Sequence, residues 1–508
     1  MNSCGNVHVG LSIEGSPTAD GKGPSIWDTF ARTPGKISTG ETGDVACDHY
    51  RRWEQDLDLL SEIGATAYRF SISWPRILPK GTGVVQQRGL DFYDRLIDGL
   101  LARDDIAAFP TLYHWDLPQA LQDAGGWHSR EIALAFEAYA GVVADRIGDR
   151  VGAFITLNEP AIHTYLGHVV GTHAPGTYDL VRVYSVIHHQ LLAHGLAVGA
   201  IRSGTRTPVG MANSLSPAMP RDAGCEADIL AAERMELLFN RQFLDPLLLG
   251  RNPADVNELF GDRSLQAIQD TGLATIGAPL DFLGFNYYNP QWVGAPGPDN
   301  PFGFELAPPP EEYPRSAFDW PVVPDGLTDL LLRLRSDYAD RLPPLYITEN
   351  GTSWPEPVHD GFRDYLRAHV RAVAAAMAGG VDVRGYFCWS LMDNFEWAEG
   401  TTQRFGLVNV DFLTQQRHRA RLRQMVRRAE RGSGDLRTQV DPGSGGAGVH
   451  LGDFPWEATG SAPFTADGTP MIAPAGTIGL RRLRWSHASG PGPRPTRGDP
   501  QAVRGTGG

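Results

Sequence analysis

Two glutamates occupy similar places in the sequence, because each follows an apolar, strand-forming run. Glu349 lies within segment 345–351 and precedes a turn-forming Asn-Gly pair, while Glu159 lies within segment 154–160 and precedes a proline. This arrangement puts a negative charge at the mouth of a buried strand. One such glutamate could merely end a strand before a turn. The repetition of the design favours a site that uses two carboxylates.

A pair of carboxyl groups surrounded by aromatic and amide side chains suits the cleavage of a glycosidic bond. One carboxylic acid protonates the leaving oxygen, and the other carboxylate attacks the sugar or activates water. In sites that retain the anomeric configuration the two groups lie about 5–5.5 Å apart and the nucleophile forms a glycosyl ester. Neither step needs a metal, and the sequence shows no cluster of metal ligands. We therefore expect no metal and no cofactor.

The neighbours of the two glutamates suggest which role each one takes. A nucleophile must stay ionised, so a nearby guanidinium helps, and Arg69 is the candidate. Tyr288 could donate a hydrogen bond to the same carboxylate. An acid must keep its proton near neutral pH, which burial favours, and Glu159 between Asn158 and a proline suits that role better. These arguments alone leave the two roles interchangeable.

Strands that alternate with helices must position these residues. Trp53, Leu57, Leu60 and Ile63, for example, recur at helical spacing. We predict strands at 67–72, 107–112, 209–212, 282–287, 345–348 and 385–391 and one that ends at Glu159, with helices at 50–63, 90–101, 130–147, 184–201, 226–243, 327–338 and 362–378. Such alternation implies a parallel sheet, and about eight units imply a closed barrel.

The predicted fold class is therefore α/β, a single (β/α)8 TIM barrel with long βα loops formed by residues 1–430. An open, doubly wound sheet is the competing architecture, but no Gly-rich phosphate loop follows the early strands. Polar and aromatic residues recur at or just after the carboxyl ends of the strands, where barrels carry their chemistry. These residues are Arg69, His114, Asn158, Glu159, Asn286, Tyr288, Glu349, Trp389 and Glu396.

The bulk composition argues against several classes of partner. A formal net charge of −14 disfavours nucleic acid or an anionic membrane as the main partner. No apolar stretch is long enough to cross a bilayer and the chain does not start like a signal peptide, so we expect a cytoplasmic protein. Four scattered cysteines indicate neither a zinc site nor a disulfide framework. Twelve tryptophans suit a concave site that stacks on flat ligand faces.

Five segments, in order, resemble motifs of glycoside hydrolase family 1, the retaining β-glucosidases. The resemblance is to the bacterial type of β-glucosidase. The resemblance runs from about Ile13 to Gln416, and a chance match of five ordered motifs is very improbable. The segments read Tyr-Arg-Phe-Ser-Ile-Ser-Trp-Pro-Arg at 68–76, Tyr-His-Trp-Asp-Leu-Pro at 113–118, Thr-Leu-Asn-Glu-Pro at 156–160, Ile-Thr-Glu-Asn-Gly at 347–351 and Trp-Ser-Leu-Met-Asp-Asn-Phe-Glu-Trp at 389–397.

The resemblance implies a role for each site residue. Glu159 would be the acid/base and Glu349 the nucleophile of a β-glucosidase. Asn158 would hold the sugar 2-hydroxyl, Trp389 would form the floor under the ring, and Trp320 would line the leaving-group side. His114, Glu396 and Trp397 would hold other hydroxyls, Asn286 and Tyr288 would support the nucleophile, and Trp115 and Phe405 would complete the substrate site.

The expected substrates are β-glucosides or cello-oligosaccharides. Phospho-sugar relatives carry a Ser and a Lys after the last strand, whereas this chain has Asn-Phe-Glu-Trp at 394–397, and plant thioglucosidases replace the acid with Gln, whereas Glu159 is present. A β-galactosidase or β-fucosidase of the same family is an alternative. A sugar-binding protein with impaired turnover is another, because Ser12 stands where the family has a Gln that grips two sugar hydroxyls.

The two ends of the chain depart from the family. The first strand is expected to be weak, and the usual final helix with its Trp-Tyr pair is missing, so we expect the seam of the barrel to be its least stable part. A short last helix at 419–430 is the remaining candidate. Residues 431–508 form a low-complexity, Gly/Pro/Arg-rich tail, which fits either a frameshifted reading of a GC-rich gene or a natural disordered extension.

Overall fold

The computed structural model describes residues 3–8, 10–103, 106–256, 272–298, 300–354 and 359–418. The predicted domain boundary at 430, the helix predicted at 419–430 and the tail at 431–508 lie outside these residues. No helix within the described ranges is both long and apolar enough to cross a lipid bilayer.

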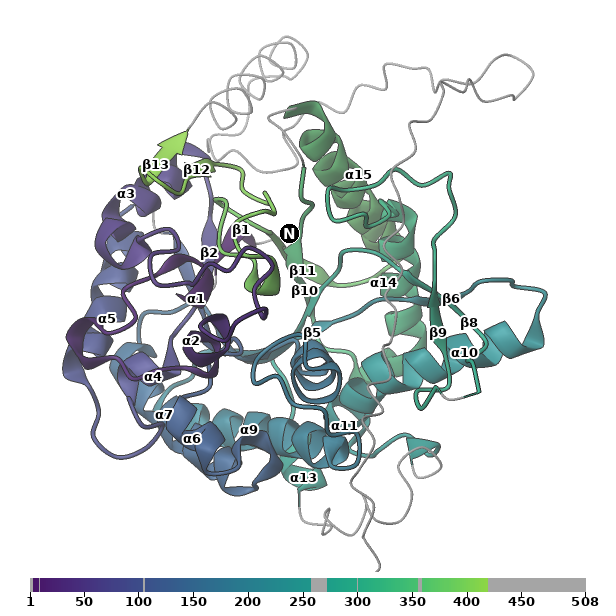
Figure 1. Ribbon diagram of the computed structural model, residues 1–508, viewed down its shortest axis with the longest axis horizontal. Coiled ribbons are helices and arrows are strands. Elements are labelled where there is room, and N and C mark those ends of the chain that lie inside the picture. Colours follow the sequence, from purple (N-terminus) through teal and green to yellow (C-terminus); the bar gives the residue numbers. More distant parts are fainter. Residues whose placement is uncertain are drawn as a thin grey trace, which may run out of the picture. The chain divides into compact units, whose positions relative to one another are not determined.

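Eight parallel strands close into a barrel in the order β1-β11-β10-β7-β5-β4-β3-β2 (Figure 1). This confirms the predicted TIM barrel. Strand interiors are buried on both faces, as in β2, β4 and β7, which explains their continuous apolar sequences. The strands are β1 (Ser3–His8), β2 (Ala67–Ser71), β3 (Ala107–Tyr113), β4 (Phe154–Asn158), β5 (Val209–Ser214), β7 (Phe282–Asn286), β10 (Leu345–Asn350) and β11 (Val383–Cys388).

Helices surround the strands (Figure 1). In α5, Tyr93, Leu96 and Leu100 are buried while the acidic residues face outward. The longer helices are α3 (His49–Glu62), α5 (Gln87–Leu101), α7 (Glu131–Ile147), α9 (Val183–Gly204), α10 (Glu226–Glu236), α11 (Gln242–Leu249), α14 (Pro324–Tyr338) and α15 (His359–Ala378). Shorter ones are α1 (Gly10–Ile13), α2 (Ile26–Ala31), α4 (Trp74–Ile77), α6 (Gln119–Asp123), α8 (Pro160–Ile162) and α13 (Leu273–Ile276), with single turns at η1 (Ala19–Gly21), η2 (Gly126–His128), η5 (Ala339–Arg341) and η6 (Trp397–Glu399).

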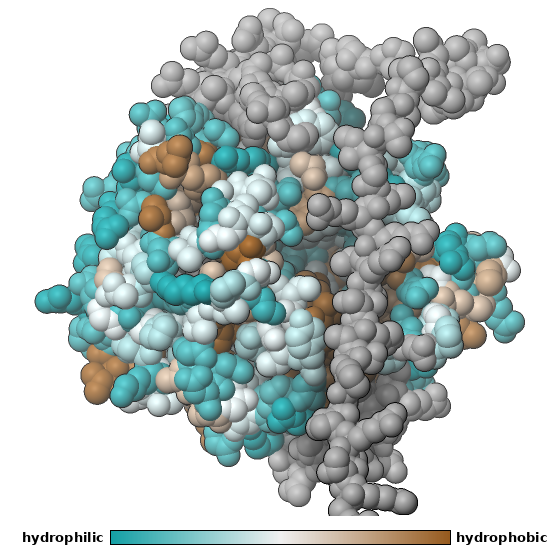
Figure 2. Space-filling view, viewed as in Figure 1, coloured by the Kyte–Doolittle hydropathy of each residue, from teal (hydrophilic) through white to brown (hydrophobic). Residues whose placement is uncertain are grey.

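The long βα loops carry two small sheets that the sequence analysis did not predict. One contains β6 (Ala218–Pro220), β8 (Gln291–Gly294) and β9 (Glu305–Ala307), and the other is the hairpin of β12 (Asn409–Asp411) and β13 (Gln416–His418). The face shown in Figure 2 is mostly polar, with scattered apolar side chains. Exposed Met219, Leu230 and Leu306 belong to the first small sheet and to α10, which packs against it.

The helix predicted at 226–243 is present, and it contains a π-helical turn that was not predicted. This turn, η4 (Leu237–Arg241), separates α10 from α11. Asn240 lies in this turn and is buried, and its amide donates hydrogen bonds to the Ser216 carbonyl and the Glu236 carboxylate. A second π-helix, η3 (His163–Val170), follows α8 and was not predicted either.

The first strand closes the barrel, although its sequence indicated a weak one. β1 pairs with β11 on one side and with β2 on the other. Gly5 permits this close approach, because a Cβ atom at that position would lie 2.4 Å from the Ala67 carbonyl oxygen. Val7 fills the interior beside it and is fully buried. Among the described residues, therefore, both edges of β1 are hydrogen-bonded.

A buried ion pair fastens the β12–β13 hairpin to the barrel. The Arg417 guanidinium donates to both carboxylate oxygens of Asp56 in α3, at 2.8 and 3.0 Å, and also to the Cys47 carbonyl. His49 contacts the same carboxylate at 2.8 Å. The side chains of Arg417 and Asp56 are almost fully buried, so each needs the other to offset its lost hydration.

Replacing Arg417 with methionine is expected to lower the free energy of unfolding by about 3–5 kcal/mol, because it leaves a carboxylate buried without its main cation. Chemical denaturation followed by fluorescence measures the loss. Arg384→Met is the matched control, since the Arg384–Asp382 pair is about half exposed and should contribute no more than about 1 kcal/mol. Equal stabilities of the two variants would contradict a fastening role for Arg417.

Candidate active site

The predicted site residues meet at the carboxyl ends of the barrel strands. Glu349 is the fifth residue of β10, and Asn286 ends β7 beside it, since the two are paired in the sheet register. Arg69 lies in the middle of β2 and is fully buried. Glu159 follows β4 directly and starts α8, where the proline after it occupies the first helical turn.

Three aromatic or acidic residues of the site have left-handed backbone conformations. The φ angles are 72° at Trp115, 45° at Glu159 and 50° at Trp397. Bulky non-glycine residues seldom adopt this region, and each such residue costs about 1–3 kcal/mol that surrounding contacts must offset. Such strain concentrates at functional sites, where it aims a side chain in a direction that regular structure does not allow.

Glu349 is held by a guanidinium and a phenol. Arg69 donates from Nη1 to Glu349 Oε1 at 2.7 Å, and Tyr288 donates its hydroxyl to Oε2 at 2.8 Å. Burial raises the pKa of Glu349, while the Arg69 charge and the Tyr288 hydrogen bond oppose that rise. Both oxygens of this carboxylate thus have partners that favour its ionised form.

Glu159 has a weaker set of partners. The Asn286 amide donates to Glu159 Oε1 at 2.9 Å. Burial, and next the charge of Glu349, raise the pKa of Glu159 to about 8, although Asn286 and Arg69 act in the opposite direction. The carboxyl therefore keeps its proton to a higher pH than an ordinary glutamic acid does. Two buried glutamates in contrasting surroundings form a pair in which one can donate a proton and the other can attack.

Asn286 lies between the two carboxyl groups. The sequence analysis predicted that it supports Glu349, and its amide does help to lower the pKa of that residue. Its amide also donates to Glu159 Oε1 at 2.9 Å and to Asn158 Oδ1 at 3.1 Å. Asn158 also accepts from Arg69 Nη2 at 2.6 Å and contacts His114 Nε2 at 2.7 Å. A single hydrogen-bond network therefore joins all of these residues to Glu349.

Aromatic rings form two groups beside the carboxylates. The ring centroids of Trp115 and Trp397 are 4.4 Å apart, and His114 stacks on Trp397 at 5.7 Å. The Trp115 indole N–H donates a hydrogen bond of 2.9 Å to the Asn158 carbonyl, so Trp115 also supports the end of β4. The second group contains Trp320, which is partly exposed. Its ring centroid lies 5.3 Å from that of Tyr288 and 6.1 Å from that of Phe405. Trp389 is buried just after β11.

A third carboxyl group, that of Glu396, is partly buried near the other two, and its Oε2 atom is buried. Burial and the charges of Glu349 and Glu159 raise the pKa of Glu396 to about 8, against a hydrogen bond from Trp389. Its Oε2 has no hydrogen-bond partner among the described residues. A buried polar atom without a partner is costly unless a ligand supplies one. Glu396 is therefore suited to bind hydroxyl groups of a ligand.

Ser12 lies next to the loop that carries Glu396. It is buried, and its carbonyl accepts a hydrogen bond of 2.9 Å from the Phe395 main chain. Its Oγ has no hydrogen-bond partner within the described residues. The short side chain therefore leaves a donor that could reach a ligand hydroxyl only at close range.

Two threonines that the sequence analysis did not single out complete the network. Thr111 Oγ1 accepts from Arg69 Nε at 3.1 Å, and Thr348 Oγ1 contacts Asn286 Oδ1 at 2.7 Å. Both are buried in barrel strands, where threonine is an ordinary strand former. The one available signal was the position of Thr348 directly before Glu349.

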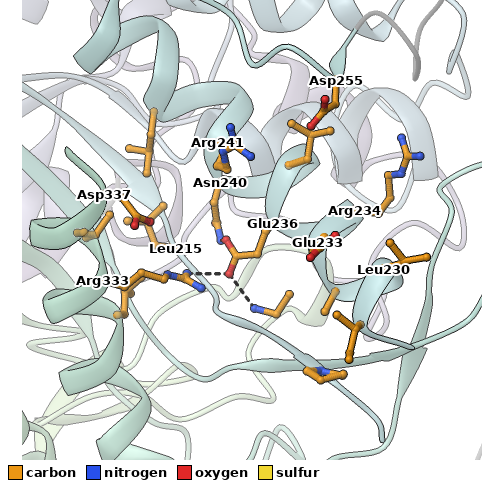
Figure 3. Close-up of a pocket in the computed structure, with 18 of the residues that line it drawn as sticks. Leu215, Leu230, Glu233, Arg234, Glu236, Asn240, Arg241, Asp255, Arg333 and Asp337 are labelled. Carbon is orange, nitrogen blue, oxygen red and sulfur yellow. Dashed lines mark hydrogen bonds and ion pairs between the residues drawn. The ribbon is translucent and has the colours of Figure 1, made fainter. Parts of the chain in front are cut away.

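One cavity is lined by residues other than the carboxylate pair (Figure 3). It has a volume of about 660 Å³ and lies between α10, η4 and α14, outside the ring of strands. The carboxylate of Glu236 forms an ion pair with Arg333 at 2.7 Å. It also accepts hydrogen bonds from the Asn240 amide and the Ala218 main-chain N–H. Glu236 is thus a structural residue. Among the described residues no group of three or more acidic, histidine or cysteine side chains could hold a metal ion.

Known proteins resemble this chain along most of its length. The sequence model for glycosyl hydrolase family 1 matches residues 5–426. A β-glucosidase of an Agrobacterium species is 44 % identical over 423 residues, which cover 81 % of this chain and 91 % of that protein. β-Glucosidase A of Thermotoga maritima is also 44 % identical, over 425 residues that cover 81 % of this chain and 93 % of the relative.

Solved structures give the same result. A family 1 β-glucosidase from Thermotoga maritima superposes with a TM-score of 0.77 at 42 % identity and covers 82 % of this chain and 94 % of its own. The virulence factor SghA of Agrobacterium tumefaciens reaches a TM-score of 0.79 at 43 % identity with the same coverage. The chain belongs to glycosyl hydrolase family 1.

Proposed function

We propose that this protein is a retaining β-glucosidase that removes terminal, non-reducing β-D-glucosyl residues by double displacement. The observation that carries the proposal is the contrast between the two buried glutamates. Glu349 has an arginine and a tyrosine as partners, whereas Glu159 has the Asn286 amide and the Ser214 hydroxyl, and its pKa is raised to about 8. Relatives at 44 % identity are named β-glucosidase and 1,4-β-D-glucan glucohydrolase.

In the first step the Glu349 carboxylate attacks the anomeric carbon. The bond between that carbon and the glycosidic oxygen breaks, and the Glu159 proton moves to the departing oxygen. The products are an alcohol and a glucosyl ester on Glu349. Arg69 and Tyr288 keep the carboxylate ionised before the attack, and both lie within hydrogen-bond distance of it.

In the second step the ionised Glu159 accepts a proton from water as the water attacks the same carbon. The ester bond to Glu349 breaks, and the Glu349 carboxylate is restored. Two inversions at one carbon give net retention. Loss of negative charge on Glu349 in the ester removes the repulsion that raised the pKa of Glu159, which favours the ionised form when it is needed as a base.

The remaining side chains form the sugar site. His114, Asn158, Glu396 and Trp397 hold hydroxyl groups, Trp389 lies under the ring, and Trp320 with Phe405 borders the leaving group. β-Glucosides and cello-oligosaccharides are the proposed substrates. Among solved relatives, SghA has been described in complex with salicin as a substrate analogue. A relative from Bifidobacterium breve, 42 % identical, is named a bifunctional β-D-glucosidase/β-D-fucosidase, so β-fucosides are a second substrate class to test.

Proton NMR during hydrolysis of an aryl β-D-glucoside tests the proposal. We expect β-D-glucose as the first product, followed by mutarotation to the mixture of anomers. α-D-Glucose as the first product would contradict double displacement. Binding of glucose or cellobiose without turnover would favour the alternative of a sugar-binding protein, which the unpartnered Ser12 hydroxyl motivates.

The pH dependence of kcat/KM is expected to show an alkaline limb near pH 8, because Glu159 must be protonated to act as the acid. Activity falls as the pH rises through this value and Glu159 loses its proton. Glu396 has a similarly raised pKa, so the two must be separated. Only the limb due to Glu159 should weaken when the substrate is a dinitrophenyl glucoside, whose leaving group needs no proton. A limb of equal depth with phenyl and dinitrophenyl glucosides would contradict its assignment to Glu159.

A further inference from the structure

We propose that Thr348 is a positioning residue for Glu159. Its hydroxyl fixes the orientation of the Asn286 side-chain amide, and this amide aims the acid/base carboxyl. Thr348 lies on the strand of the nucleophile, yet the residue that it positions through Asn286 follows another strand, β4. The inference deepens the proposed function and rests on it.

The direction of every hydrogen bond in the network follows from Arg69. A guanidinium has no acceptor atom, so Asn158 must present Oδ1 to Arg69 Nη2, which lies 2.6 Å away. The other end of the Asn158 amide therefore donates to His114 Nε2 at 2.7 Å. Burial, with the Arg69 charge, lowers the pKa of His114, which leaves its ring neutral and able to accept.

The same direction continues into Asn286. Asn158 Oδ1 already accepts from Arg69, and its contact with Asn286 at 3.1 Å requires a donor, so Nδ2 of Asn286 faces it. This Nδ2 also donates to Glu159 Oε1 at 2.9 Å. The oxygen of the Asn286 amide must then point the opposite way, toward Thr348 Oγ1 at 2.7 Å, and accept the hydroxyl proton.

Packing holds the Thr348 side chain in the orientation that this contact needs. A Cβ atom built on Gly284 would lie 2.7 Å from the Thr348 methyl carbon, so the glycine leaves room for that methyl group. The same Cβ atom would lie 3.3 Å from the Thr348 hydroxyl oxygen, which contacts Asn286 Oδ1 at 2.7 Å. Thr348 and Asn286 are both buried, so water does not replace the hydroxyl as a donor.

Removal of the hydroxyl should therefore act on the acid rather than on the nucleophile. Without a donor, Asn286 Oδ1 would be buried and unpaired, and the amide would turn or shift. Glu159 would lose its aligned N–H donor. Glu349 keeps Arg69 and Tyr288, because Arg69 contacts Thr348 through the main-chain carbonyl, at 3.0 Å, which a side-chain substitution leaves in place. Only the contribution of Asn286 to Glu349 changes.

The test compares two substrates in Thr348→Val, which keeps the branched shape and lacks the hydroxyl. Phenyl β-D-glucoside needs a proton on its leaving group, and dinitrophenyl β-D-glucoside does not. We expect kcat/KM to fall roughly ten- to hundred-fold for the phenyl glucoside and no more than about three-fold for the dinitrophenyl glucoside. The ratio of the two values does not depend on the amount of folded enzyme, so partial unfolding of the variant does not affect it.

Three further variants complete the design. Thr348→Ser keeps the hydroxyl and should restore the wild-type ratio, while Thr348→Ala should change the ratio as valine does. Thr156→Val is the matched control, since Thr156 is a buried strand threonine whose hydroxyl contacts His194 and no member of the network. The alkaline limb of the phenyl glucoside profile should also move to higher pH in Thr348→Val, because the lost N–H donor had favoured ionised Glu159.

The variant Glu159→Gln distinguishes failure of the Thr348 proposal from failure of the proposed function. A change of the substrate ratio in Glu159→Gln but not in Thr348→Val would overturn the role of Thr348 and leave the proposed function intact. No change of the ratio in Glu159→Gln would overturn the acid role of Glu159, and with it the proposed function. An equal loss on both substrates in Thr348→Val, matched by Thr156→Val, would show a purely structural threonine.

Discussion

The substitution Glu349→Gly is expected to lower kcat for aryl β-D-glucosides by at least about 10⁴-fold, because it removes the group that forms the covalent intermediate. Arg69, Tyr288 and Glu159 remain, so the variant should still bind its substrate. Steady-state kinetics with a dinitrophenyl glucoside measures the loss. A substrate that needs no acid is chosen so that the effect on the nucleophile is seen alone.

Azide provides the control for this variant. In Glu349→Gly the anion can enter the space of the lost carboxylate and attack once, which should restore turnover and yield α-glucosyl azide. In Glu159→Gly the glucosyl ester still forms, and azide should attack it to yield β-glucosyl azide. The opposite pair of anomers would reverse the two assigned roles, and wild-type activity in Glu349→Gly would remove this residue from the mechanism.

The second large effect concerns Arg69, which is expected to be needed for both stability and activity. It donates to Glu349, Asn158, Thr111 and the main chain of Thr348, and it is fully buried. Arg69→Met leaves Glu349 buried without its cation, and we expect a loss of about 3–5 kcal/mol in the free energy of unfolding. The pKa of Glu349 should rise further, which moves the acid limb of kcat/KM to higher pH.

Denaturant unfolding and pH profiles measure these two effects of Arg69→Met. The control is Arg146→Met, because Arg146 contacts Asp91 and Asp94 at a partly exposed position where an ion pair contributes about 0–1 kcal/mol. Full activity of Arg69→Met with an unchanged acid limb would contradict the assignment of Arg69 as the residue that keeps Glu349 ionised. A stability loss equal to that of Arg146→Met would contradict its role in the buried network.

Much of the barrel and the main site residues could be predicted from the sequence. An apolar run that ends in a polar residue, such as the run before Glu349, predicts a strand that is buried on both faces. It also predicts that the polar side chain lies at the carboxyl end of this strand. Because parallel strands put all their carboxyl ends on one face, residues far apart in the chain, such as Arg69 and Glu349, could be expected to meet there. The structure places Arg69 Nη1 2.7 Å from Glu349 Oε1.

Other features depend on contacts that no local pattern records. β1 has a Gly-containing, weakly apolar sequence, and its place in the barrel comes from pairing with β2 and β11. The π-turn η4 contains Asn240, whose burial and contact with the Ser216 carbonyl the helical spacing of its neighbours does not reveal. Arg417 and Thr348 have ordinary sequence surroundings, and their importance comes from partners on distant segments, Asp56 and Asn286.

The most direct test of the account is to trap the ester on Glu349. A dinitrophenyl glucoside with fluorine in place of the 2-hydroxyl should form the ester quickly, because its leaving group departs readily, and hydrolyse it slowly, because fluorine destabilises the oxocarbenium-like transition state. Mass spectrometry of the digested protein should then show one fluoroglucosyl group on the peptide that contains Glu349. Labelling of Glu159 or Glu396 instead, or continued turnover with no labelled peptide, would contradict Glu349 as the nucleophile.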